Sequence, residues 1–364
     1  MIFILITITV LIILYFIVTS QDVFGAEAKG ERLERMQQSK HFKDKKFQNL
    51  SYTPSLTEGY SMPKVMSDFF FKKKDPLLKP IKNLPSIHTD LKNLSKDKDV
   101  FIWMGHSSYF IQTDGVSFLI DPVLSLYGSP FKFFNKAFAG ADIFKPEDIP
   151  NIDYLVITHD HYDHLDYPTV KAIKDKVGKV ILPLGVGAHL EKWGYKPEQL
   201  IEEEWGAEVI LKNDIKITFT PARHFSGRKT QRNVTLWTSY VLETPTKKIF
   251  LGGDSGYDTH FKMIGEQFGP FDYAIMENGQ YNEAWKYIHA LPEDVIQASI
   301  DVKAKKIIPV HSSKFALALH PWNEPLKKVL RLGKEKNLDI LTPMIGEPVD
   351  LNKEDQQFRI WWED

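Results

Sequence analysis

The sequence of 364 residues contains no cysteine. Disulfide bonds and thiolate metal ligands are therefore excluded, and any bound zinc has to be held by histidine and carboxylate side chains. A surplus of charge is also missing, because 46 basic residues face 47 acidic ones and the net charge is −1. Without a basic surplus no overall field attracts nucleic acid, and we expect no nucleic-acid partner.

The chain is expected to divide into four parts. Hydrophobic residues make up 43% of it, which is ample for a buried core. Residues 1–20 form an apolar segment, residues 21–97 a polar extension that wraps the domain, residues 98–350 the domain itself, and residues 351–364 a C-terminal tail. The sequence is also compatible with a homodimer.

Residues 1–19 are predominantly apolar, and the first charged side chain is Asp22. A helix needs about 20 apolar residues to cross a membrane, so this segment predicts an N-terminal membrane helix that anchors the protein. A cleaved signal peptide is the alternative, with Ala26 and Ala28 as the small residues of a cleavage site. Against it, a basic region before the apolar run is missing, and the run exceeds the usual ~7–15 residues. The basic residues that follow favour a cytoplasmic catalytic domain, whereas a processed precursor would be exported.

From residue 100 onward, short β-rich runs alternate with helical candidates at residues 168–176, 292–302 and 324–336. Strands mixed with helices in this way indicate an α+β fold of two sheets whose outer faces are covered by helices. The strands are expected at residues 100–104, 109–112, 116–120, 154–157, 179–182, 208–211, 215–220, 235–242, 248–251, 273–276 and 306–310.

A dense group of metal-binding side chains follows one of these strands. His159, His161, Asp163 and His164 come directly after the apolar run at residues 154–157. Imidazole and carboxylate together suit zinc and its neighbours. Backbone geometry limits how many of these side chains can reach one ion, so the spacing favours two ions. A solvated polar loop is the alternative, but three histidines in so short a loop argue against it.

Three further candidates follow other strands. His224 comes after the alternating strand at residues 215–220, Asp254 after the strand at residues 248–251, and His311 at the end of the strand at residues 306–310. A single histidine after a strand is more often a structural residue than a ligand. Four such strand ends in one chain, in an order that resembles a known metal-binding family, reverse that expectation and indicate a metal centre.

The pattern His-x-His-x-Asp-His, followed by these strand-end residues in this order, resembles the metallo-β-lactamase superfamily. Segments 103–106 (Trp-Met-Gly-His), 118–122 (Phe-Leu-Ile-Asp-Pro) and 285–289 (Trp-Lys-Tyr-Ile-His) are similar to the branch that contains N-acylphosphatidylethanolamine-hydrolysing phospholipases D and their bacterial relatives. The similarity extends from about residue 30 to residue 347. Segment 276–280 (Met-Glu-Asn-Gly-Gln) departs from the branch, so the resemblance does not imply the shape of the pocket.

The resemblance implies an αβ/βα sandwich with two zinc ions per chain at one edge between the sheets; the same donors also accept Mn²⁺ or Fe²⁺. A hydroxide that bridges the ions would attack the substrate. The resemblance assigns His159, His161 and His224 to the first ion, Asp163, His164 and His311 to the second, and Asp254 to a bridging, catalytic position.

Two more histidines are candidates for the substrate site. The resemblance puts His106 at a strand end near the metals, and the alternative is a structural hydrogen bond to Asp121 or to the backbone. It puts His289 on a loop that faces the substrate, where we expect it to protonate the leaving group or contact the phosphate. Asp160 and Asp166 are expected to support the site by hydrogen bonding and helix capping, without binding metal.

We therefore expect a metal-dependent hydrolase that cleaves a phosphodiester, most specifically in phospholipids of the N-acylphosphatidylethanolamine type. Residues 69–74 and 130–138 interleave aromatic rings with lysines, a pattern typical of a bilayer interface or of rings that pack inward beneath solvated lysines. The alternatives are another ester, a lactone or a nuclease substrate on the same metals. The resemblance implies that an iron-dependent oxidoreductase of this kind would carry Glu at position 161 and add a flavin domain, and neither is present. A non-catalytic binding module would be expected to have lost ligands, whereas all seven positions are filled.

Overall fold

Two seven-stranded sheets form the centre of the protein. The computed structural model describes residues 2–363. The first sheet has the order β16-β3-β4-β5-β6-β7-β8 and the second the order β15-β14-β13-β12-β11-β10-β9. The first consists of β3 (Val100–Trp103), β4 (Tyr109–Thr113), β5 (Val116–Ile120), β6 (Ile152–Val156), β7 (Val177–Pro183), β8 (Leu200–Glu203) and β16 (Pro348–Asp350). The second consists of β9 (Glu208–Ile210), β10 (Lys216–Thr220), β11 (Ser239–Glu243), β12 (Lys248–Leu251), β13 (Phe271–Glu277), β14 (Ala304–Val310) and β15 (Asp339–Ile340).

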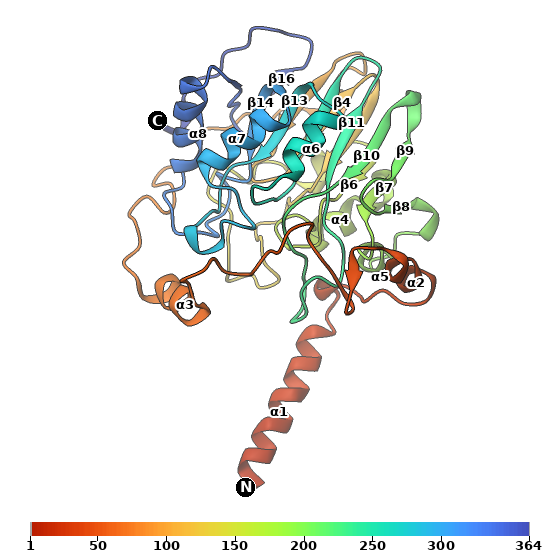
Figure 1. The fold of residues 1–364 in the computed structure, drawn as a ribbon, viewed down its shortest axis with the longest axis vertical. Coiled ribbons are helices and arrows are strands. Elements are labelled where there is room, and N and C mark those ends of the chain that lie inside the picture. Colours follow the sequence, from red (N-terminus) through yellow and green to blue (C-terminus); the bar gives the residue numbers. More distant parts are fainter. Residues whose placement is uncertain (1, 364) are drawn as a thin grey trace.

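The sheets pack face to face and helices cover their outer faces (Figure 1). Phe118 of the first sheet and Phe219, Tyr240 and Ile275 of the second belong to one buried cluster between them. Helices α4 (Tyr167–Ile173) and α5 (Gly187–Lys192) pack on the first sheet. Helices α6 (His260–Gln267), α7 (Pro292–Asp301) and α8 (Glu324–Glu335) pack on the second. The predicted αβ/βα sandwich is therefore confirmed.

Each sheet combines antiparallel and parallel strands. In the first sheet β3, β4 and β5 are antiparallel, and the pairing becomes parallel from β5 through β8. In the second sheet β9 to β12 are antiparallel, and β12 to β15 are parallel. Since parallel strands end at the same edge of a sheet, the loops after β6, β12 and β14 are free to meet between the two sheets.

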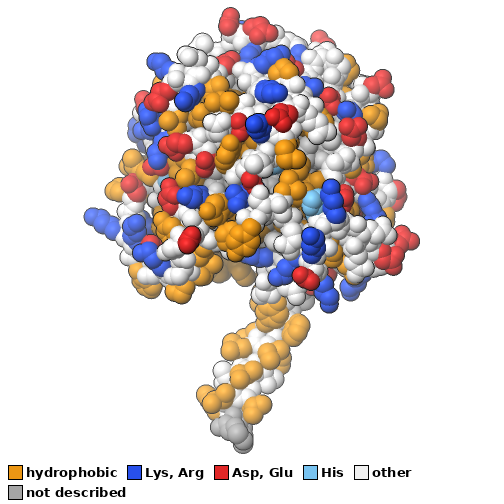
Figure 2. Space-filling model, viewed as in Figure 1, with side chains coloured by type: hydrophobic (Ala, Val, Ile, Leu, Met, Phe, Trp, Pro, Cys, Tyr) orange, Lys and Arg blue, Asp and Glu red, His pale blue; other side chains and the backbone are white. Residues whose placement is uncertain are grey.

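Helix α1 (Ile2–Thr19) projects from the body of the molecule, with largely apolar side chains exposed along its length (Figures 1 and 2). Within residues 2–363, no helix is both long and apolar enough to cross a membrane. The predicted membrane-spanning helix is therefore not supported.

The region predicted as a polar extension contains α2 (Gly30–Gln38), the hairpin of β1 (Phe42–Lys43) and β2 (Lys46–Phe47), and α3 (Met62–Phe71). Arg32 on α2 donates to Glu202 at 2.7 Å and forms an ion pair with Glu191 at 2.7 Å, which ties α2 to the first sheet and to α5. Phe47 is completely buried. Its backbone amide donates to the Asn233 carbonyl at 2.8 Å.

The last residues of the chain also pack against the domain. Trp361 is 1% exposed, and its ring lies near Trp103 of β3 and Trp322, with ring centroids 6.2 Å from each. The indole Nε1 of Trp361 donates to the Thr342 carbonyl at 3.2 Å. The predicted C-terminal tail therefore contributes a large side chain to the core between the sheets.

Replacing this ring tests that contribution. Trp361→Ala should lower the free energy of unfolding by about 3–5 kcal/mol, because it empties a packed site that cannot fully collapse. Denaturant titration measures the shift. The neighbouring Ile360→Ala is the control, since Ile360 is 47% exposed, and it should stay within about 0.5 kcal/mol of the parent protein. Equal stability of the two variants would contradict the assignment of Trp361 to the core.

Candidate metal centre

Four strand ends bring the predicted metal ligands to one edge of the sandwich. The loop after β6 carries three of the histidines, and His224, Asp254 and His311 follow β10, β12 and β14. The edge therefore combines residues from both sheets. The structure brings all seven predicted ligands together: His159, His161, Asp163, His164, His224, Asp254 and His311. Their role as ligands stays a prediction.

The first cluster consists of His159, His161 and His224. Nδ1 of His161 lies 2.9 Å from Nε2 of His159 and 3.2 Å from Nε2 of His224. Burial lowers the pKa of all three imidazoles, that of His161 to about 4. The rings are therefore neutral, which is the form of histidine that binds a metal ion.

The second cluster lies on the other side of Asp254. Its donor atoms belong to Asp163, His164 and His311, together with His106. Asp254 places Oδ2 3.1 Å from Nε2 of His164 and Oδ1 2.9 Å from Nδ1 of His311. The same carboxylate lies 3.8 Å from Nε2 of His224 in the first cluster. Asp254 therefore stands between the clusters, where a bridging carboxylate is expected.

The arrangement of the donor atoms suits binding of a divalent ion better than hydrogen bonding among the donors themselves. Three imidazole nitrogens of the first cluster face one another at hydrogen-bond distance, although neutral rings cannot all supply a proton there. Nε2 of His311 is buried without a hydrogen-bond partner, which costs free energy unless something else binds it. Nitrogen and oxygen donors without thiolates suit Zn²⁺, and also Mn²⁺ or Fe²⁺.

The predicted ligands are oriented by hydrogen bonds behind them. Nδ1 of His164 lies 2.8 Å from Oδ2 of Asp121, and Nδ1 of His224 lies 2.7 Å from the Ile288 carbonyl. The hydroxyl of Thr158 lies 3.0 Å from Nδ1 of His159. Such partners fix the ring orientation and the tautomer of a metal-binding histidine. Asp166 caps α4 by accepting from the Thr169 amide at 3.3 Å, as predicted.

His106 is completely buried and is itself one of the donors of the second cluster. Its Nε2 is 2.9 Å from Oδ2 of Asp163, and its backbone has a φ of 54°. The side-chain partner of His106 is therefore Asp163, where the sequence suggested Asp121 or the backbone. His106 is not among the described residues that line the adjacent cavity, and its contact with substrate stays a prediction.

His289 lines the cavity and is held by a carboxylate that the sequence analysis did not single out. Its Nδ1 lies 3.1 Å from Oε2 of Glu277, whose Oε1 accepts from the Ala290 amide at 2.5 Å. Burial raises the pKa of Glu277. Burial also opposes the charged form of His289, but the nearby Glu277 carboxylate outweighs it, and the pKa of His289 lies above its ordinary value. Glu277 and His289 also lie close enough to Asp254 and His311 to form a further group able to hold an ion.

His161, Asp163, Asp254 and His311 line a cavity of about 270 Å³. Apolar side chains form much of its wall, and Arg232 adds a positive charge. The apolar lining consists of Leu56, Met62, Val65, Phe225, Trp285, Ile288 and Leu317. Met62 and Val65 belong to α3, so the predicted extension supplies part of this wall.

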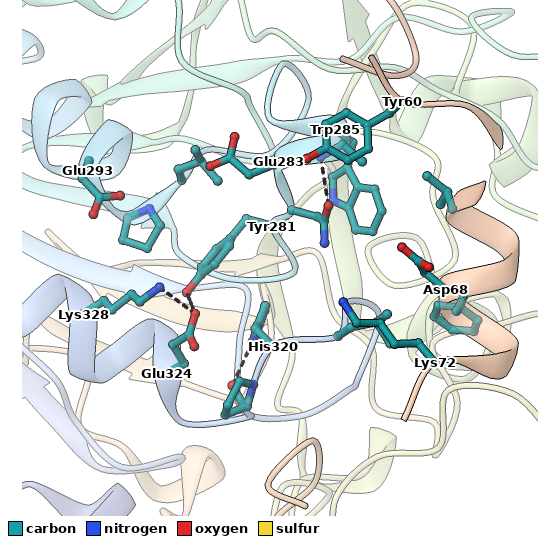
Figure 3. A pocket seen from close by; sticks show the side chains of 18 residues that line it. Tyr60, Asp68, Lys72, Tyr281, Glu283, Trp285, Glu293, His320, Glu324 and Lys328 are labelled. Carbon is teal, nitrogen blue, oxygen red and sulfur yellow. Dashed lines mark hydrogen bonds and ion pairs between the residues drawn. The ribbon is translucent and has the colours of Figure 1, made fainter. Parts of the chain in front are cut away.

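A second cavity of about 540 Å³, drawn in Figure 3, shares Val65 and Trp285 with the first. Charged groups of both signs face it, with Asp68 on α3, Lys72 just after that helix and Lys328 on α8. Tyr281 donates to Glu324 at 2.9 Å across its wall. Its described lining residues include none of the predicted metal ligands. The smaller cavity, which the ligands do line, is therefore the candidate reaction site.

Residues 117–312, more than half of the chain, match the family described as the β-lactamase superfamily domain. The chain belongs to this superfamily. It is 37% identical over 264 residues to an uncharacterized protein of Mycobacterium tuberculosis, with 71% of this chain and 70% of that protein covered. It is 31% identical over 268 residues to N-acyl-phosphatidylethanolamine-hydrolyzing phospholipase D 1 of Caenorhabditis elegans, with 67% and 74% covered.

Solved structures agree with this membership. A metallo hydrolase of the archaeon Ignicoccus hospitalis superposes with a TM-score of 0.51 at 22% identity, over 69% of this chain and 97% of that one. At this identity the likeness shows the shared superfamily fold alone. Superfamily membership and hydrolase relatives together identify the chain as a metal-dependent hydrolase, as the resemblance implied.

Elemental analysis tests the two-ion prediction. Zinc-loaded protein should contain close to two ions per chain, and His164→Ala and Asp254→Ala should each lose at least one, because each removes a donor from the edge. His88→Ala is the control, since the His88 side chain is 52% exposed beside Asp148. Active, fully loaded protein with one ion or fewer would contradict the prediction.

Proposed function

We propose that the protein is a di-zinc phosphodiesterase that cleaves phospholipids of the N-acylphosphatidylethanolamine type, in the manner of a phospholipase D. The observation that carries the proposal is the joining of two donor clusters to one cavity with an apolar wall. A phosphate held at the donors would place the apolar chains of its lipid along that wall. Relatives at about 30% identity include an enzyme whose name states this activity.

The chain's own residues would divide the work of binding and proton transfer. Two bound zinc ions would supply positive charge for the phosphate oxygens and would acidify water. Arg232 at the cavity would attract the anionic phosphate, while Leu56, Phe225 and Leu317 would exclude water from the bond that breaks. Asp254, between the clusters, would keep the two sites at a constant separation.

We assign His289 the role of proton donor to the leaving group. Its ring lies at the cavity and Nδ1 faces Glu277, so Nε2 is the nitrogen available to the substrate. Glu277 keeps the proton on Nδ1 in the neutral ring and stabilises the charged ring. A His289 imidazolium would donate its Nε2 proton to the departing alkoxide, whose high basicity makes unassisted departure slow.

We further propose that the protein works at a membrane surface. Helices α1 and α3 lie at the same end of the molecule (Figure 1), and α3 exposes Met66, Phe70 and Phe71 beside Lys72 to Lys74. Phe133 is also exposed, and it stacks on Phe131, whose ring contacts Phe24 at the base of α1. Exposed rings beside lysines suit the interface of an anionic bilayer.

Substrate screening tests the reaction class. Phosphodiesterase activity on N-acylphosphatidylethanolamine vesicles should vanish with a chelator and return with zinc or manganese, because the donors alone lack the charge that the reaction needs. Release of the N-acylethanolamine is the measurement. Rapid turnover of lactones or other esters, with no phosphodiester cleaved, would contradict the lipid assignment while leaving the metal assignment intact.

Kinetics of His289→Ala test the proton donor. The variant should keep its metal content and lose about 10²–10⁴-fold in kcat, because a positioned acid contributes that much. The loss should shrink for a nitrophenyl phosphodiester, whose leaving group hardly needs a proton. Glu277→Gln should show a smaller loss with the same dependence on the leaving group, and His88→Ala should match the parent protein.

Two outcomes would contradict the assignment of His289. Loss of zinc from His289→Ala would make it a ligand of the Asp254 group. An equal loss for both substrates would restrict it to binding the phosphate.

A further inference from the structure

Residues 22–26, the stalk, join α1 to the domain. Side chains of the domain hold the stalk by hydrogen bonds and ring contacts. Nε1 of Trp193 donates to the Asp22 carbonyl at 2.8 Å, and Nζ of Lys192 donates to the Gly25 carbonyl at 3.1 Å. The amide of Ala26 donates to Nδ1 of His189 at 2.9 Å. Phe24 is buried, and its ring meets the edge of Tyr162 at 6.2 Å between centroids. Tyr162 lies between two predicted ligands, so the stalk touches the metal-binding loop directly.

Arg228 connects the stalk to both ends of that loop. Its side chain is buried, and its Nη1 donates to the carbonyls of Asp160 at 2.8 Å and Leu165 at 2.7 Å. Its Nε and Nη2 both donate to the Val23 carbonyl, at 3.1 Å and 2.7 Å. The guanidinium also lies 4.2 Å from the Tyr162 ring centroid. A single buried cation therefore holds residues 160, 165 and 23 together.

His189 makes a second connection. Because its Nδ1 accepts from Ala26, Nε2 carries the proton in the neutral ring and donates to Oδ2 of Asp160 at 3.3 Å. Asp160 is itself buried and accepts from the Gly227 amide at 2.7 Å and the Thr235 hydroxyl at 2.9 Å. Since Asp160 stands between His159 and His161, its position sets the direction of both neighbouring side chains.

Loss of the stalk would leave these groups unsatisfied. Arg228 would keep its two bonds to the loop and lose the two to the Val23 carbonyl, and His189 would lose its donor. A buried cation with unpaired N–H groups is costly, so the loop would rearrange or admit water. Cleavage after Ala26 or Ala28 would remove the whole stalk.

We propose that the stalk is a working part of the metal centre: docked on Arg228 and His189, it holds loop 159–165 in its metal-binding geometry, and it is therefore retained in the active protein. Arg228 and His189 are positioning residues in this proposal. The proposal concerns metal binding alone, so its outcome is independent of the lipid assignment.

The first test displaces the stalk within the full chain. Gly25 has a φ of +67°, and a Cβ there would lie 2.1 Å from Nδ1 of His189. Gly25→Ala should therefore separate the stalk from His189. Gly30→Ala is the matched control, because Gly30 has a φ of +55° with nothing within 4 Å of its Cβ position. Competition with a chromophoric chelator should show zinc bound about 10-fold or more weakly in Gly25→Ala. The Gly30→Ala value should stay within about 2-fold of the parent protein.

The second test removes the cation. Arg228→Gln and Lys229→Gln change the charge equally on adjacent residues, and the Lys229 side chain is partly exposed, 3.7 Å from Glu27. We expect Arg228→Gln to bind zinc about 10-fold or more weakly and to alter the visible absorption spectrum of the Co²⁺-substituted protein. Lys229→Gln should preserve both. Thermal unfolding of each variant separates a local change in the loop from loss of the fold.

Three results would overturn the proposal. The first is a lowered melting temperature of Gly25→Ala with zinc affinity and cobalt spectrum unchanged, which would make the stalk a simple attachment. The second is an unaltered zinc affinity in Arg228→Gln. The third is an N-terminal sequence of active, metal-loaded protein that begins after residue 28, whereas retention predicts a start before Asp22.

Discussion

The crowding of imidazoles and carboxylates at one buried edge is the constraint on which the rest of the structure depends. His159, His164 and Asp254 are each almost completely shielded from water, so every polar atom there needs a partner. Strands from both sheets have to end at this edge to supply those partners. The hydrogen bond between Thr158 and His159, and the one that Asp121 accepts from His164, follow from the same need, because a misdirected ring would face an apolar core.

The sequence predicted the sandwich and the gathering of strand-end residues because both depend on local patterns. The strand at residues 116–120 coincides with β5, and apolar runs before His159 and His311 do form β6 and β14. The edge strand β8 was missed because its Leu-Ile-Glu-Glu sequence is half charged. The short α5 and α6 were missed because six and eight residues carry too little helical periodicity.

Contacts between distant parts of the chain left no local signal. In the sequence, Glu277 stood out only as part of segment 276–280, which departs from the resembled branch. In the fold its Oε2 lies 3.1 Å from Nδ1 of His289. Arg228 and Val23 are separated by 205 positions, and no spacing rule connects them. Composition likewise described residues 21–97 as polar, but could not indicate that Val65 of α3 lines the cavity. Such roles come from tertiary packing, which a single sequence does not encode in any short window.

The division of the donors between the two sheets has a consequence for the lifetime of the protein. His159 and His164 follow a strand of the first sheet, whereas His224 and His311 follow strands of the second. Ions shared by these residues would fasten the two halves of the sandwich, and separation of the halves would require their release. The supply of the metal would then govern how often the halves open to proteases, and starvation for it would hasten turnover of the enzyme.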